Sequence, residues 1–202
     1  MVSAQRTQSE TTDELEIGFR PTGSEAQSIS ELETGPRTFA ILIGIDNYQA
    51  PHVPRLNHAV NDAVQLYRLL RLVGGVPESQ ICLLCDNEAT REAIMSELRS
   101  LVTNQHIRRG DTVIIYFSGL VNLVPAPVNW GVGFAESLVP VNHGLAEGDS
   151  ECHGIPDRTI AAVLYSLLQA HQINIVRLST YRCIVNVLCF ARRTSFSTVA
   201  AF

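Results

Sequence analysis

The sequence lacks the features that would tie the chain to a membrane. No apolar run reaches the roughly 20 residues needed to cross a bilayer, and the N-terminus has no charged-then-apolar leader pattern. No basic amphipathic stretch suggests binding to a membrane surface. We therefore expect a cytoplasmic protein with no membrane partner.

Positive charge is also scarce. The 15 basic residues are outnumbered by 20 acidic residues, which gives a formal net charge of −5. A nucleic-acid partner would require a basic stripe to neutralise its phosphates, and the sequence has none. The composition therefore argues against a nucleic-acid partner.

The cysteines do not form a metal-binding pattern. Cys82 and Cys85 have Cys-x-x-Cys spacing, but no second pair and no His-x-x-x-His follows, and a zinc site needs about four ligands. Two cysteines along a strand are typical of core filling. The odd count of five in a chain without an export pattern predicts reduced thiols. We expect neither a metal site nor a cofactor from these residues.

Three regions are predicted along the chain. Residues 1–37 are rich in Ser, Thr, Gln and Glu and predict a disordered N-terminal arm. Residues 38–176 alternate between strand and helix patterns, and residues 177–202 form a tail that matches no expected pattern. Apolar runs predict strands at residues 39–45, 80–85 and 112–117 and from residue 173 onward. Helical spacing predicts helices over residues 61–72, 88–102 and 156–169.

This alternation predicts an α/β fold. A mostly parallel, doubly wound sheet with helices on both faces follows from strands that alternate with helices. Residues 120–150 are rich in Pro and Gly and predict loops, with one short extended piece at residues 137–141. No Gly-x-Gly-x-x-Gly turn follows the first strand, which argues against a dinucleotide-binding domain.

Four segments together resemble the caspase and metacaspase family of cysteine endopeptidases, in particular fungal metacaspases. They are residues 38–48 (TFAILIGIDNY), 56–63 (LNHAVNDA), 112–120 (TVIIYFSGL) and 154–161 (GIPDRTIA). The resemblance implies a caspase-like fold that covers the large-subunit portion and is truncated after the fourth strand. It also implies hydrolysis of peptide bonds in protein or peptide substrates by a Cys–His pair.

The position of the general base has changed. In the family the turn after the third strand reads Ser/Ala-Gly-His-Gly, and here Ser118-Gly119 is followed by Leu120 and Val121. Leucine has no titratable group, so the histidine that would activate the thiol is lost. His143 and His153 lie in the same general region and are weak substitutes.

The nucleophile position has changed as well. The family motif after the fourth strand places Thr180 at the aspartate position and Arg182 at the cysteine position. Cys183 lies one residue late, and a slip of one residue reverses side-chain direction along a strand unless a bulge compensates. We therefore predict no catalytic pair, and keep Cys183 with His143 or His153 as the rearranged alternative.

The substrate pocket is better preserved. By resemblance, Asp62 occupies the position of the family's pocket acid, which implies a preference for Arg or Lys before the cleaved bond. From the residues alone, Asn61 and Asp62 are equally suited to cap the helix, and Asp46 suits a loop turn. Family members often need calcium, but no acidic cluster in this sequence provides a site for it.

These observations lead to two main functional predictions. The first is a cysteine endopeptidase domain by lineage that is inactive in this chain. The second is a pseudo-peptidase that regulates or scaffolds an active caspase-like relative.

Overall fold

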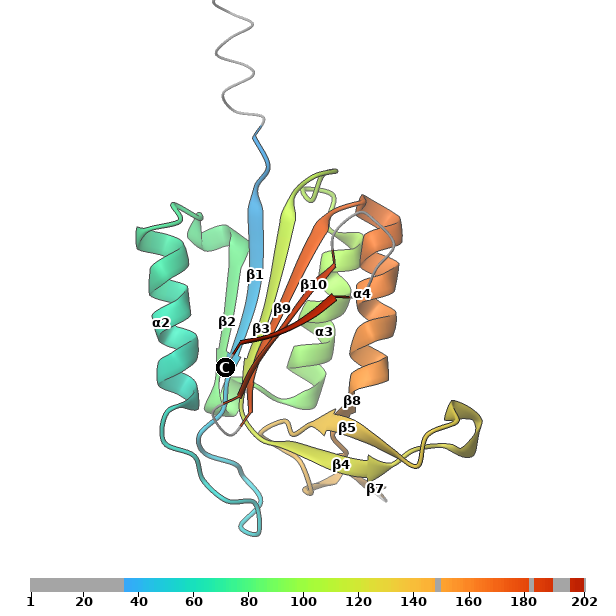
Figure 1. Ribbon diagram of the computed structural model, residues 1–202. Helices are drawn as coiled ribbons and strands as arrows, with labels where there is room; N and C mark the ends of the chain where they lie inside the picture. The colour runs from blue at the N-terminus through green and yellow to red at the C-terminus, as the bar shows by residue number, and fades with distance from the viewer. Residues whose placement is uncertain (1–34, 148–149, 182–183, 191–196, 202) are drawn as a thin grey trace, which may run out of the picture. The chain divides into compact units, whose positions relative to one another are not determined.

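Six strands form the main sheet of this protein. The computed structural model describes residues 35–147, 150–181, 184–190 and 197–201. In the central part of the sheet four parallel strands follow the order β2–β1–β3–β9 (Figure 1). Their bounds are Ile81–Cys85 (β2), Thr38–Gly44 (β1), Thr112–Ser118 (β3) and Asn174–Tyr181 (β9). The predicted fold class, a mostly parallel α/β sheet, is confirmed.

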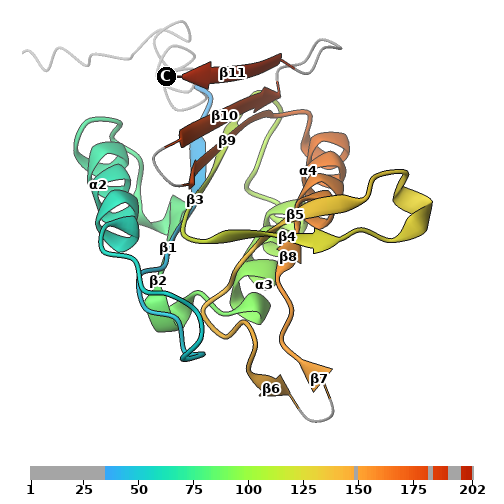
Figure 2. The same ribbon diagram turned by 60° about the horizontal axis from the view of Figure 1, so that its bottom comes forward.

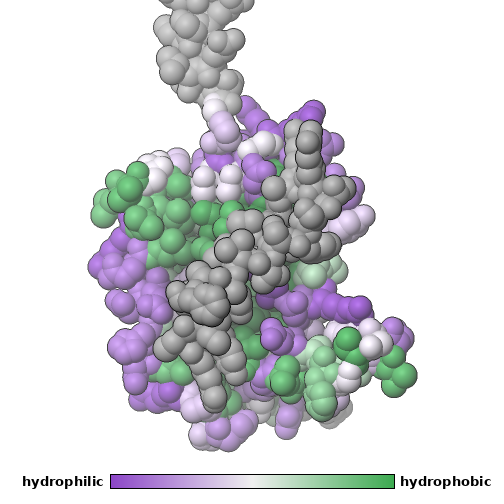
Figure 3. Space-filling model, in the orientation of Figure 1, coloured by the Kyte–Doolittle hydropathy of each residue, from purple (hydrophilic) through white to green (hydrophobic). Residues whose placement is uncertain are grey.

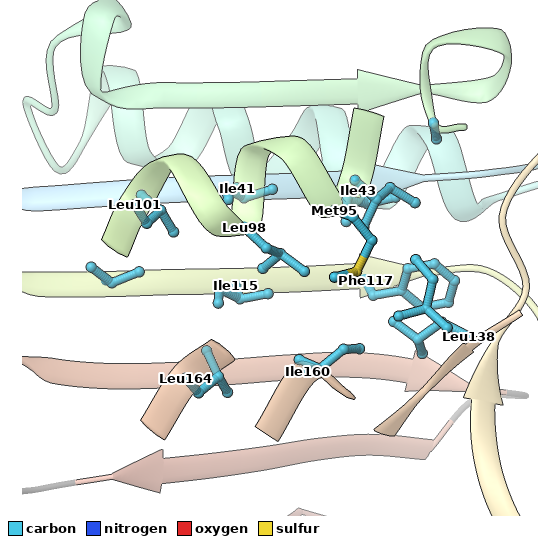
Figure 4. Packing of buried hydrophobic residues seen from close by; sticks show 14 of the residues in the cluster. Ile41, Ile43, Met95, Leu98, Leu101, Ile115, Phe117, Leu138, Ile160 and Leu164 are labelled. Carbon is cyan, nitrogen blue, oxygen red and sulfur yellow. The ribbon is translucent and has the colours of Figure 1, made fainter. Parts of the chain in front are cut away.

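Helices cover both faces of this sheet, which explains why the strands read as continuous apolar runs. The helices are α2 (Ala59–Leu72), α3 (Arg91–Thr103) and α4 (Asp157–His171). Successive residues of β1 point to opposite faces, so Ile41 and Ile43 join the larger core cluster while Ala40 and Leu42 join the smaller one under α2. Figure 4 shows the larger cluster, in which α3 and α4 contribute Met95, Leu98, Leu101, Ile160 and Leu164.

Arg37, near the start of the described residues, is held at the turn that precedes β3. Of the predicted arm, residues 1–34 lie outside the described residues, and only residues 35–37 can be placed. The backbone amide and the guanidinium of Arg37 donate to the buried Asp111 carboxylate at 2.8 and 3.1 Å. Asp111 also accepts from the Arg108 amide at 2.8 Å and thereby closes the turn before β3.

The sheet continues beyond the fourth strand, where the sequence suggests truncation. Strand β9 pairs with β3 up to Thr180, and β10 (Ile184–Phe190) and β11 (Ser197–Ala201) add two antiparallel strands. Arg177, which follows the last residue of the predicted domain, is polar on a largely apolar strand. Its guanidinium forms an ion pair with Asp157 in the first turn of α4, so its charge is compensated there.

The region predicted as loops also contains strands. β4 (Val121–Pro125) follows β3 after two residues and pairs antiparallel with β5 (Phe134–Leu138), and β5 pairs with β8 (Ile155–Pro156). The predicted extended piece begins near the end of β5. The hairpin of β4 and β5 projects below α4 and carries the short helix η3 (Val128–Trp130) (Figures 1 and 2). Short elements complete the chain: η1 (Glu78–Gln80), η2 (Asp86–Glu88), β6 (Ala146–Glu147) and β7 (Ser150–Glu151).

Helix α2 approaches the end of β1 closely, and Gly44 makes this contact feasible. A Cβ atom at Gly44 would lie 2.6 Å from the Ala59 carbonyl oxygen and 2.8 Å from Val60 Cα. Both obstacles are backbone atoms, so they cannot move aside as a flexible side chain would. We expect Gly44→Ala to reduce the free energy of unfolding by about 1–3 kcal/mol because of this overpacking.

Urea denaturation followed by circular dichroism measures this loss. The matched control is Gly133→Ala, because nothing lies within 4 Å of a Cβ atom there. Equal stability of the two variants would contradict a close approach of α2 to β1.

Candidate active site at the carboxyl ends of the parallel strands

The last residues of β1, β2 and β3 lie side by side, next to Thr180 near the end of β9. In the strand register Gly44 pairs with both Cys85 and Ser118, and Ser118 pairs with Thr180. The turns that follow therefore leave the sheet at one edge. In open parallel sheets this edge is where ligands bind and catalytic groups collect.

The turn after β3 is held by Tyr48. The Leu120 amide donates to the Tyr48 hydroxyl at 2.7 Å, and the Leu120 carbonyl accepts from the Val139 amide at 3.0 Å. The Leu120 side chain packs against the larger core cluster. Burial raises the pKa of Tyr48 above its ordinary value, and the Leu120 amide acts in the opposite direction, so the hydroxyl stays protonated at neutral pH. Both the backbone and the side chain of Leu120 thus make contacts that stabilise this turn.

The close packing of Tyr48 and Phe117 on the turn leaves no room for a side chain at Gly119. A Cβ atom there would lie 2.7 Å from Cζ of Phe117 and 3.0 Å from the Tyr48 hydroxyl oxygen. The Ser-Gly sequence therefore reflects tight packing of Tyr48 on the turn. This packing needs no catalytic histidine, so the turn keeps its shape with leucine at the next position.

Asp46 caps helix α2 from a distance in the sequence. Its carboxylate accepts from the amides of Ala59 at 2.8 Å and Val60 at 3.2 Å, and its carbonyl accepts from the Leu56 amide at 2.8 Å. The N-cap residue itself, His58, makes no side-chain capping bond. The sequence predicted Asp46 only as a loop-turn residue. Its capping of α2 is an additional role.

Asp86 fixes the loop that carries Asp46. Its carboxylate accepts from the amides of Asp46 at 2.8 Å and Asn47 at 2.9 Å, and from the Asn47 side chain at 2.8 Å. Burial acts to raise the pKa of Asp86, but these hydrogen bonds and the charge of Arg55 outweigh it and hold the pKa below its usual range. Its backbone has a φ of +44°, an uncommon conformation for a residue other than glycine. The sequence signal for this residue was an acid directly after a strand.

Asp62 lies in the first turn of α2, and its side chain is partly exposed. The interpretation of Asn61 and Asp62 as helix caps is wrong, because the helix begins at Ala59 and Asp46 binds its first amides. Within the described part of the chain, the Asp62 carboxylate has no hydrogen-bond or ion-pair partner.

The nucleophile region can be placed only in part. The backbone of Thr180 pairs with Ser118, the last residue of β3. Arg182 and Cys183 lie outside the described residues. The proposed pairing of Cys183 with His143 or His153 has therefore no geometry to describe.

His143 occupies a turn near two other histidines. The Gly144 amide donates to the Cys152 carbonyl at 2.9 Å, and the Cys152 amide donates to the Leu145 carbonyl at 2.8 Å. Burial lowers the pKa of His143, and the nearby charges of His52 and His153 lower it further, against a hydrogen bond with the Cys152 backbone. The neutral imidazole is thus favoured at physiological pH.

The thiols of Cys82 and Cys85 are poor nucleophiles. Burial, together with Glu97, raises the pKa of Cys82 to about 12, and burial followed by Glu88 raises the pKa of Cys85. The reactive form of cysteine is the thiolate, which both environments disfavour. Cys82 packs against the larger core cluster, as predicted, and Cys152 is buried.

The described residues do not fit calcium. They contain no group of three or more His, Cys, Asp or Glu side chains that could hold a metal ion. Asp46 and Asp86 accept hydrogen bonds from backbone amides with their carboxylates, whereas calcium takes about six to eight oxygen ligands.

No described helix has the length and apolarity that crossing a bilayer would need.

Comparisons with known proteins agree with this geometry. The family model described as the caspase domain matches residues 37–173, which is more than half of the chain. A crystal structure of a protein from Geobacter sulfurreducens is similar in fold, with a TM-score of 0.54 and 18% sequence identity. The match covers 71% of this chain and 50% of that one, so this chain spans half the length of that structure. No curated protein matches the chain.

The low pKa of Asp86 leads to a prediction about pH. Its folded-state pKa lies below the unfolded value, so its stabilising effect is complete above that value, about 3.9, and is lost as the pH falls toward the folded pKa. We expect wild type to be more stable than Asp86→Asn by a constant amount between about pH 5 and 7, and by less below about pH 4.

Urea denaturation at a series of pH values measures this difference. Glu136→Gln is the control, since Glu136 is an exposed carboxylate without a partner in the described part of the chain. A stability difference between wild type and Asp86→Asn that is the same at every pH would contradict the role given to the Asp86 charge.

Proposed function

Because this chain belongs to the caspase-domain family, we propose that it is a cysteine-endopeptidase-type domain that no longer hydrolyses peptide bonds. The observation that carries the proposal is Leu120. It occupies the family's histidine position in a turn held by the Tyr48 hydroxyl and packed on the core.

The chemistry of amide hydrolysis explains the weight of this residue. A cysteine nucleophile needs a base to form the thiolate and to carry its proton to the leaving amine. An aliphatic side chain can do neither. In a serine peptidase, removal of one member of the nucleophile–base pair costs on the order of 10⁶ in turnover. Here the cysteine position, Arg182, differs as well.

His143 and His153 are weak replacements for the missing base. His143 belongs to a turn closed by backbone hydrogen bonds with Cys152, so movement toward the end of β3 would break them. His153 follows Cys152 directly and is exposed. These contacts support a proposal without a rearranged pair.

A second function is favoured by Asp62. We propose that this carboxylate binds Arg or Lys side chains and that the chain acts as a pseudo-peptidase, regulating or scaffolding an active caspase-like relative. Support comes from the partial exposure of Asp62 and from the absence of a partner for it among the described side chains, while Asp46 does the capping. The free thiols of Cys82 and Cys85 suit a cytoplasmic location.

The first proposal is tested with an arginyl-aminomethylcoumarin peptide. We expect wild type and Leu120→His to show no turnover above buffer, because the histidine variant still lacks a cysteine at position 182. Cys183→Ala is measured beside them. Turnover by wild type that Cys183→Ala abolishes would establish the rearranged pair and overturn the proposal.

The second proposal is tested by binding of a fluorescent arginyl peptide, measured by anisotropy. A charge-assisted hydrogen bond is worth about 1.5–3 kcal/mol, so we expect Asp62→Asn to weaken binding at least about tenfold. The control ligand carries citrulline, which has nearly the shape of arginine but no charge. Equal affinity for the two peptides would show that Asp62 does not select a cation.

A further inference from the structure

A groove is lined by residues of α3, α4 and the short helix η3. Its main hollow has a volume of about 630 Å³. Its wall residues include Met95 and Arg99 from α3, Arg158 and Val163 from α4, and Trp130 from η3. A second hollow of about 270 Å³ shares Arg99 and Val163 with the first, so the two form one continuous groove along both helices.

Two arginines in this groove lack an anionic partner. Arg37, Arg71 and Arg177 each form an ion pair with a carboxylate, whereas Arg99 and Arg158 have none among the described residues. Both are exposed. In a chain with a net charge of −5, two uncompensated cations in one apolar groove are a local reversal of charge.

Trp130 orients one of these cations. The guanidinium carbon of Arg158 lies 5.0 Å from the centre of the Trp130 ring, a cation–π contact. Stacking on a ring face leaves the N–H groups at the edge of the guanidinium open to a carboxylate. The contact also connects the projecting hairpin to the first turn of α4.

The hairpin adds apolar surface next to Trp130 in the sequence. Val128, Val132 and Phe134 are exposed by 99%, 53% and 65%. Figure 3 shows hydrophobic side chains at the lower right, where this hairpin projects. Exposed apolar groups beside cations suit a ligand that carries both aliphatic and acidic side chains.

The length of the groove fits a short peptide. From Arg158 to Ser166, α4 rises about 12 Å at 1.5 Å per residue. An extended peptide covers that length with about four residues. We propose that this groove binds an extended acidic segment of a partner protein, with its carboxylates on Arg99 and Arg158 and an aliphatic side chain over Met95 and Val163.

The single tryptophan of the chain makes the proposal directly testable. The probe is an acetylated, amidated hexapeptide of alternating glutamate and leucine, added to the full chain while Trp130 emission is recorded. We expect a saturable change in emission. The same peptide with glutamine in place of glutamate should bind at least about tenfold more weakly, because it cannot form charge-assisted pairs with arginine.

Matched variants separate a built groove from general charge attraction. We expect Arg99→Gln with Arg158→Gln to weaken binding of the glutamate peptide about tenfold. The control, Arg68→Gln with Arg109→Gln, removes the same charge at two exposed arginines elsewhere and should leave affinity unchanged. Arg99→Gln alone removes one cation and leaves the contact between Arg158 and Trp130 in place. Circular dichroism checks that each variant is folded.

Three outcomes would overturn the proposal: equal binding of the glutamine peptide, equal weakening by the control pair, or tighter binding of a hexathymidylate oligonucleotide than of the glutamate peptide. The first would leave a purely apolar surface, the second a non-specific charge effect, and the third a nucleic-acid site. The proposal does not depend on the residues at the ends of β3 and β9, so it stands or falls apart from the loss of hydrolysis.

Discussion

The architecture of the strand ends depends on two carboxylates that bind backbone amides. Asp86 holds the loop after β1, and Asp46 within that loop binds the first amides of α2. The first amides of a helix have no partner inside the helix, so an acceptor must come from elsewhere. The two residues thereby connect the ends of β1 and β2 to α2, and Gly44 allows the helix to lie directly on β1.

This arrangement explains how the turn after β3 keeps its shape with leucine at position 120. None of the contacts that shape the turn after β3 uses the side chain of a histidine: Tyr48 binds a backbone amide, and Gly119 provides room. Leucine at position 120 gains apolar contact with the core, whereas an imidazole in the same place would need polar partners. The shape of this turn therefore does not depend on an imidazole at position 120.

The sequence alone predicted the parallel strands and the helices in their order along the chain, because the apolar periodicity of each element is local. It was insufficient where a partner lies far away in the chain. β4 and β5 were predicted as loops because each is short and gains its stability from the other, and residues with several prolines and glycines give no local strand pattern. The cap of α2 was missed for the same reason. Asp46, which binds the first amide of the helix, lies 13 residues before it, whereas the capping role was given to Asn61 and Asp62.

Arg177 shows why polarity alone did not end the fourth strand. Pairing of β9 with β3 uses the backbone, which is indifferent to the side chain, so only the burial of the charge could oppose it. The Arg177 side chain is 12% exposed, and Asp157 in the first turn of α4 pairs with its guanidinium. A partly buried charge without a counterion is strongly destabilising, whereas the attraction of a counterion offsets part of the desolvation cost. Asp157 stands three residues before Ile160, a core residue of α4, so the helix that packs on the sheet also supplies the charge that lets the strand continue.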